Sequence, residues 1–164
     1  MISKFITPIL LVTMTAFLQQ TNFLLIYNVK PNLVLVIIIV MAFFIEFLWY
    51  YLLLMLIGLS LIRTSPGFEK EIIVLGFLLL VIFPTKKILP WKPQISIALL
   101  TIIATILFYL FSSENIIIKS PALAVTEIFY NVIFGLIIYL SYYVYNGRQE
   151  KFFINYEISA SKRF

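Results

Sequence analysis

The chain has 164 residues, of which 63% are hydrophobic and 12% charged, and its net charge is +5. A soluble domain is nearer half apolar and a quarter charged, so a water-soluble globule of this size could not bury so much apolar surface. Cysteine, histidine and aspartate are absent, which removes disulfides, thiolate and imidazole metal sites, and histidine acid–base chemistry. We therefore expect a membrane protein without enzymatic activity, cofactor or metal.

Apolar runs separated by polar, proline-containing breaks predict the membrane spans in chain order. The first run, at about 5–20, resembles a signal peptide, but no small-x-small cleavage site stands near Gln19, so we interpret it as a retained span. Ser120-Pro121 has the pattern of a helix cap followed by a first helical residue. The predicted domain covers residues 1–146, with spans at about 5–20, 33–46, 48–62, 71–83, 94–112 and 121–144, and residues 147–164 form a basic and aromatic cytoplasmic tail.

The stretch 33–62 allows either one helix or two. About 30 apolar residues would make a helix about 45 Å long, against a hydrocarbon core of roughly 30 Å. Two short helices turning between Phe44 and Trp49 would place Glu46 at a headgroup surface, away from the bilayer centre, where a carboxylate is costly. No glycine or proline marks that turn. We favour two helices, which gives an all-α bundle of six short transmembrane helices; the alternative has five spans with one long helix over 33–62.

The distribution of basic residues predicts the orientation. With six spans and both termini in the cytoplasm, eight basic residues lie inside and four outside, as the positive-inside rule requires. The inside set is Lys4, Lys86, Lys87, Lys92, Arg148, Lys151, Lys162 and Arg163, and the outside set is Lys30, Arg63, Lys70 and Lys119. This scatter through short loops also disfavours a nucleic-acid partner.

Polar and small residues within the last span are the first candidates for a functional site. Glu127, Asn131 and Gly135 are spaced i, i+4 and i+8, so they share one helical face. In lipid such a stripe turns toward protein, because asparagine hydrogen-bonds across helices and glycine lets backbones approach. It is either a face that docks a partner or ligand, or a packing face inside the bundle.

Two glycines and one loop complete the set of candidates. Gly58 and Gly76 are the only glycines in the middle spans, and close helix packing explains both. The proline-rich loop that contains Lys86, Lys87, Trp91 and Lys92 is basic and carries an interfacial tryptophan. It is a candidate cytoplasmic contact, although topology-determining charge alone also accounts for it.

The order of features resembles a known family. Leu18-Gln19-Gln20-Thr21 ends the first span, Lys30-Pro31-Asn32-Leu33 enters the second, Ile57-Gly58-Leu59-Ser60-Leu61 ends the third, and Leu75-Gly76-Phe77-Leu78 and Thr126-Glu127-Ile128-Phe129-Tyr130-Asn131 follow. This pattern is similar to the rod-shape-determining protein MreD family. The entry at Pro31 and Asn32, which we assign a structural role, is its best motif. The chain departs from the family after Gly58, where Leu61-Ile62-Arg63 stands in place of an aspartate.

The resemblance implies a non-enzymatic scaffold of the cell-elongation machinery in the bacterial inner membrane. It implies association with MreC-like, RodA-like and class B penicillin-binding proteins, and a role in organising peptidoglycan synthesis and rod cell shape. The family's bundle is similar to the substrate-binding subunits of energy-coupling factor transporters, which supplies the alternative function. A solute pocket needs convergent polar groups. The inner spans offer few beyond Glu127 and Asn131, namely Thr13, Thr15, Ser60, Ser96, Thr101 and Thr105, which favours the scaffold.

Overall fold

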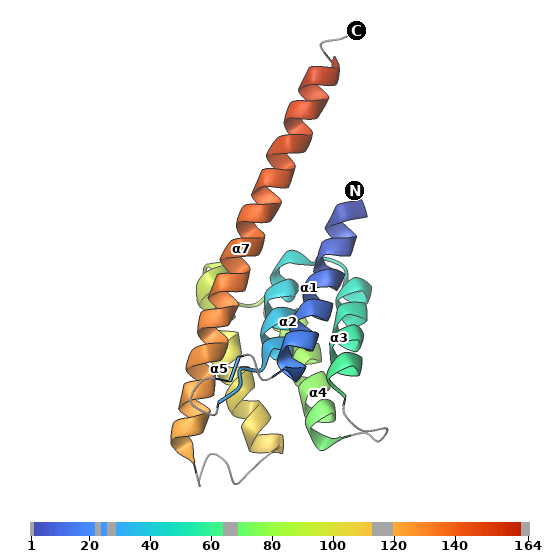
Figure 1. The fold of residues 1–164 in the computed structure, drawn as a ribbon. Helices are drawn as coiled ribbons and strands as arrows, with labels where there is room; N and C mark the ends of the chain where they lie inside the picture. Colours follow the sequence, from blue (N-terminus) through green and yellow to red (C-terminus); the bar gives the residue numbers. More distant parts are fainter. Residues whose placement is uncertain (1, 22–23, 26–28, 64–68, 113–119, 162–164) are drawn as a thin grey trace.

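The computed structural model describes residues 2–21, 24–25, 29–63, 69–112 and 120–161, and within these ranges it describes side chains from residue 5 to residue 147. The described chain forms six α-helices and no β-strand, which confirms the all-α prediction (Figure 1). The helices are α1 (Ile2–Gln20), α2 (Leu33–Phe44), α3 (Leu48–Ile62), α4 (Lys70–Thr85), α5 (Pro93–Ser112) and α7 (Pro121–Ser161). Lys119, Lys162 and Arg163, which entered the charge count, lie outside the described residues.

The helices alternate in direction, so the start of α1 and the end of α7 lie at the same end of the bundle (Figure 1). We call this the terminal end; it also holds the connection between α2 and α3 and that between α4 and α5. Helix α7 has 41 residues, which at 1.5 Å each makes it about 60 Å long, twice the thickness of a hydrocarbon core. It continues through most of the segment predicted as a separate tail and projects past the other helices at the terminal end (Figure 1).

The stretch 33–62 is broken into two helices, so the alternative of one long helix is wrong. Helix α2 ends at Phe44 and α3 begins at Leu48, with extended backbone at Ile45 and Phe47. The break needs no glycine or proline, because these dihedral angles are open to any residue. Glu46 is exposed at the turn, as the two-helix interpretation requires.

Helix α2 is the centre of the bundle. It packs against all five other helices, and every residue from Leu33 to Ala42 is buried. A helix that is apolar on all sides is stable only where it is surrounded, which explains its uninterrupted run of valine and isoleucine. Gly58 of α3 allows the closest approach, since a Cβ atom there would stand 3.0 Å from Cγ1 of Val34. Gly76 of α4 similarly faces Leu59, because a Cβ atom built there would stand 3.4 Å from Cδ1 of Leu59.

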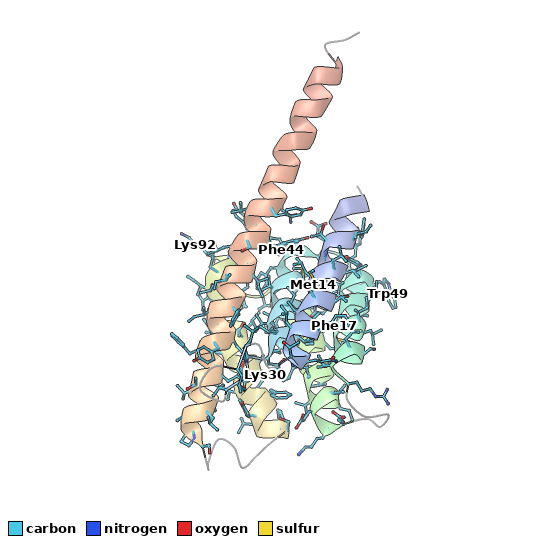
Figure 2. All side chains as sticks on the ribbon, in the orientation of Figure 1. Met14, Phe17, Lys30, Phe44, Trp49 and Lys92 are labelled. Atoms are coloured by element: carbon cyan, nitrogen blue, oxygen red, sulfur yellow. The ribbon has the colours of Figure 1, made fainter. Side chains whose placement is uncertain are left out.

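The outer surface of the bundle is strongly apolar. Met14 and Phe17 of α1 and Trp49 of α3 project outward (Figure 2). Two helical segments, Pro93–Ser112 and Pro121–Gly147, are long and apolar enough to cross a membrane, and only about a third of each is buried. Phe5–Gln20, Leu33–Phe44 and Leu48–Ile62 are shorter apolar helices. Soluble monomers rarely expose contiguous apolar surface on this scale.

Candidate functional site

The predicted stripe on α7 faces the inside of the bundle. Asn131 is fully buried, Glu127 is 8% exposed and Gly135 is buried. A Cβ atom at Gly135 would lie 3.5–3.6 Å from Val36 of α2 and Ile97 of α5. Of the two interpretations offered for this stripe, the described monomer therefore has the packing face, and the three residues are not available as an exposed docking surface.

Asn131 joins three helices through its side-chain amide. Its Oδ1 atom accepts a hydrogen bond from the backbone N–H of Asn32 at 2.8 Å, and its Nδ2 atom donates to Oγ1 of Thr105 in α5 at 3.1 Å. The same nitrogen lies 3.5 Å from Oε1 of Glu127, one turn earlier in α7. The amide thus connects the start of α2 to the middle of α5 and α7.

The start of α2 is buried, so its free N–H groups need partners inside the protein. Asn32 caps the helix by accepting from the N–H of Leu35 at 3.1 Å, and Oε1 of Gln19 accepts from the N–H of Val34 at 2.8 Å. The N–H of Leu33 donates to the carbonyl oxygen of Pro31 at 3.1 Å. With the bond from Asn32 to Asn131, all four N–H groups from residue 32 to residue 35 are satisfied. Pro31 and Asn32 thus both take part in closing the buried start of α2.

A second part of the network joins α5 and α7. The hydroxyl of Tyr109 donates to Oε2 of Glu127, and the hydroxyl of Thr105 donates to the carbonyl oxygen of Thr101 at 2.8 Å. Oγ1 of Thr101 is the one buried side-chain oxygen or nitrogen in the described residues without a hydrogen-bond partner. We use "polar network" below for Gln19, Asn32, Thr105, Tyr109, Glu127 and Asn131.

The polar network connects the helices from which its members come. Its donors and acceptors are occupied by one another or by the backbone, across four helices. No group of three metal-ligating side chains occurs among the described residues. Buried networks of this kind fix the relative position of the elements that they connect.

At the opposite end of α2, Lys86 satisfies the carbonyl groups that close the helix. Its Nζ atom donates to the carbonyl oxygens of Ala42 and Ile45, the latter at 2.5 Å, and lies 4.2 Å from the centre of the Phe83 ring. Burial lowers the pKa of Lys86, neighbouring Lys87 lowers it further, and Glu46 acts in the opposite direction. Positive charge at a helix C-terminus is favourable, so Lys86 stabilises the break between α2 and α3.

The other three candidate contact residues are at the surface. Lys87, Trp91 and Lys92 are exposed in the connection between α4 and α5. Lys92 lies at the terminal end and Lys30 at the opposite end (Figure 2). Of the four candidates in this loop, Lys86 is thus partly used within the fold, and the remaining three are free to meet headgroups or a partner.

Sequence reasoning missed Gln19 and Tyr109 as members of the polar network. A usable signal was present for Tyr109, because Thr105 and Tyr109 are spaced i, i+4 in one apolar helix and Glu127 and Asn131 repeat that spacing in the next. Two such pairs on helices joined by one loop predict a polar contact between them. Gln19 carries no comparable signal, because its partner is the backbone of another helix.

Comparisons with known proteins do not assign the chain to a family. No family model, no curated protein and no solved structure matches the chain.

Proposed function

We propose that the protein is a non-enzymatic membrane scaffold of the bacterial cell-elongation machinery, which helps to organise peptidoglycan synthesis and maintain rod shape. The observation that carries this proposal is the contrast between inside and outside. The polar network inside the bundle is paired within itself and with the backbone, and Oγ1 of Thr101 is the one buried side-chain oxygen or nitrogen without a partner in the described residues. The outer faces of α1, α3, α4, α5 and α7, in contrast, expose large apolar side chains. Such a molecule offers surfaces to lipid and to partner helices rather than reactive groups to a substrate.

The proposed location is the bacterial inner membrane, crossed six times, with both termini in the cytoplasm. The terminal end holds six basic positions of the described chain, against three at the opposite end, so the positive-inside rule assigns it to the cytoplasm. The six are Lys4, Lys86, Lys87, Lys92, Arg148 and Lys151, and the three are Lys30, Arg63 and Lys70. Trp49 and Trp91 are exposed at this end, as tryptophans at a membrane–water interface are. The short helices α2 and α3, of 12 and 15 residues, fit this arrangement if α2 is shielded from lipid by its neighbours.

The proposed partners follow from the resemblance to the MreD family. They are MreC-like and RodA-like proteins and a class B penicillin-binding protein, contacted through membrane helices. The surfaces available to them are the apolar faces of α1, α3, α4, α5 and α7 and the basic loop at Lys87–Lys92.

Co-purification from native membranes tests this function. The full-length tagged protein would be extracted in mild detergent and the associated proteins identified, with an unrelated polytopic protein carrying the same tag as the control. We expect enrichment of cell-wall synthesis proteins over the control, and loss of rod shape when the protein is depleted. Rod-shaped growth after complete depletion would refute the proposed role.

One observation favours the alternative, a substrate-binding membrane subunit of an energy-coupling factor type transporter. A pocket of about 610 Å³ at the end opposite the termini is lined by Gln19, Gln20, Lys30, Ile62 and Arg63. Its polar lining suits a small anionic solute better than a lipid. Recovery of an ATPase-driven coupling module in the same co-purification would select this function over the scaffold.

A further inference from the structure

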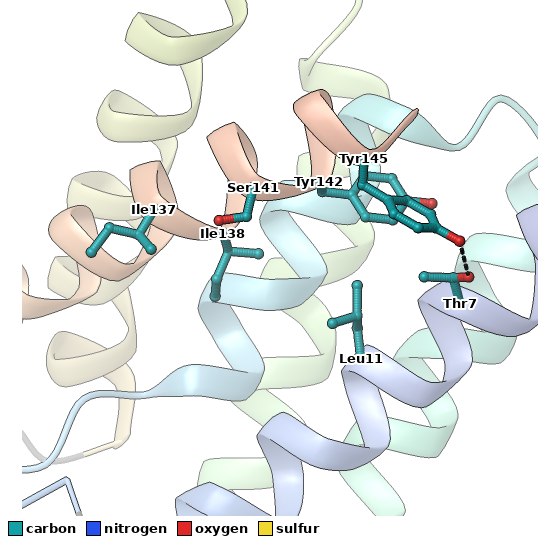
Figure 3. A pocket seen from close by; sticks show the side chains of 7 residues that line it. All are labelled: Thr7, Leu11, Ile137, Ile138, Ser141, Tyr142 and Tyr145. Carbon is teal, nitrogen blue, oxygen red and sulfur yellow. Dashed lines mark hydrogen bonds between the residues drawn. The ribbon is translucent and has the colours of Figure 1, made fainter. Parts of the chain in front are cut away.

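A groove separates α1 from α7 at the terminal end of the bundle. Both helices pack on α2, but their backbones do not contact each other. The groove has a volume of about 260 Å³ and is partly open to the outside. Its lining side chains come from α1 and α7 (Figure 3). Its lining residues are Thr7, Leu11, Ile137, Ile138, Ser141, Tyr142 and Tyr145.

The polarity of the groove is graded along its length. Leu11, Ile137 and Ile138 line its inner part, where the hydroxyl of Ser141 is the one polar side-chain group, whereas the hydroxyls of Thr7 and Tyr145 meet at the terminal end of the groove, 3.3 Å apart (Figure 3). A binding site with an apolar body and a polar mouth suits an amphipathic ligand rather than a purely apolar one.

A basic residue stands one helical turn beyond each of these two hydroxyl-bearing residues. Lys4 stands three residues before Thr7 in α1, and Arg148 stands three residues after Tyr145 in α7. Because residues three apart share a helical face, both basic positions belong to the groove side of their helices, one turn beyond the hydroxyls. Two basic positions one turn beyond the hydroxyls would complement a single anionic headgroup.

The length of the groove distinguishes between two possible occupants, a lipid acyl chain and a partner's transmembrane helix. From Ile137 to Tyr145 the helix rises about 12 Å, which matches one leaflet, about 15 Å or half of the hydrocarbon core. A partner's transmembrane helix would need a groove through both leaflets. Nearer the start of α7, Asn131 and Gly135 are instead packed against α2 and α5.

We propose that this groove binds one acyl chain of an anionic phospholipid from the cytoplasmic leaflet, with its phosphate between the positions of Lys4 and Arg148. The inference rests on the membrane location given under the proposed function, but not on the elongation partners. A bound lipid would fill the gap between α1 and α7 and tie the first and last helices together.

Photo-crosslinking tests the proposal. The full-length protein in vesicles of phosphatidylcholine would receive trace phosphatidylglycerol with a diazirine in the acyl chain, and the labelled residues would be mapped by mass spectrometry. We expect labelling to concentrate on α1 around Leu11 and on α7 from Ile137 to Ser141. The variant Ser141→Trp should reduce that labelling at least fivefold. Ser60→Trp, an equal change at an exposed serine of α3, should leave it unchanged.

A second experiment tests whether the site recognises the lipid headgroup. The double variant Lys4→Gln with Arg148→Gln should remove the preference for the phosphatidylglycerol probe over a matched phosphatidylcholine probe, while groove labelling by both persists. Labelling spread evenly around the bundle, or equal in the two serine variants, would overturn the proposal while leaving the membrane location intact. A partner peptide crosslinked in the groove in native membranes would also overturn it. No labelling at any position would instead refute the membrane location.

Discussion

Replacing Asn131 by leucine tests the role of the polar network most sharply. Leucine has the same number and branching of side-chain heavy atoms as asparagine and is a better helix former, so the change removes the amide without shortening the side chain or weakening the helix. Two well-formed hydrogen bonds are lost, at 2.8 Å and 3.1 Å. Hydrogen bonds inside membrane bundles average about 0.6 kcal/mol each, which gives about 1.2 kcal/mol for the pair.

The greater loss of stability comes from Asn32, whose backbone N–H is left buried without a partner. An unsatisfied buried donor costs about 1–3 kcal/mol. Together these contributions predict that Asn131→Leu lowers the free energy of unfolding by about 2–4 kcal/mol. The loss should arise mainly where α2 enters the bundle, because Asn131 holds its first N–H group.

The assay is unfolding in mixed micelles by titration with sodium dodecyl sulfate, followed by tryptophan fluorescence. Thr126→Val is the matched control, since this hydroxyl donates only within its own helix, to Ala122, and its loss should cost under about 0.5 kcal/mol. If Asn131→Leu unfolds within about 0.5 kcal/mol of the wild type, which is the scatter of a surface change, the network does not hold the bundle together as described.

Three further changes probe other contacts. Gly58→Leu should destabilise the bundle by about 1–3 kcal/mol through overpacking against Val34. Gly147→Leu, where a Cβ meets nothing within 4 Å, should cause no loss of stability in the same titration, because leucine favours helix more than glycine does. Tyr109→Phe should cost about 1 kcal/mol by removing the bond to Glu127, and Tyr143→Phe at an exposed ring should cost nothing measurable; equal losses would contradict the network. Lys86→Met should lower the thermal midpoint by exposing unpaired carbonyls of α2. Because folding lowers the pKa of Lys86 below 10.5, the unfolded chain binds this proton more readily, so the wild type should gain stability over Lys86→Met as the pH rises toward 10.5; a constant difference would contradict the burial of that amine.

The helices were largely predictable because their boundaries are local features. Pro93 and Pro121 stand at the first positions of α5 and α7. Proline is favoured at the first position of a helix, so these residues indicate where the two helices begin. The break near Glu46 was predicted from the cost of burying a charge rather than from any turn residue. The residue that closes α2 there, Lys86, lies 41 residues beyond Ile45 in the chain, so no local pattern could reveal it.

The candidate site was predictable only in part. The spacing of Glu127, Asn131 and Gly135 identified an inward face, but periodicity cannot say what an asparagine contacts. Its main partner is a backbone N–H at Asn32, and backbone groups leave no trace in residue identity. The continuation of α7 past residue 144 was also hidden, because polar residues that favour helix, such as Gln149 and Glu150, fit a helix in water as well as a tail.

The central claim is that the six helices cross a membrane with the terminal end in the cytoplasm, and cysteine accessibility tests it most directly. The chain has no cysteine, so single cysteines at Glu46, Lys92 and Lys30 can be labelled without background by a membrane-impermeant maleimide in intact and permeabilised cells. We expect labelling of the Lys30 position in intact cells, and of the Glu46 and Lys92 positions only after permeabilisation. Labelling of Lys30 and Lys92 from the same side would contradict the claim.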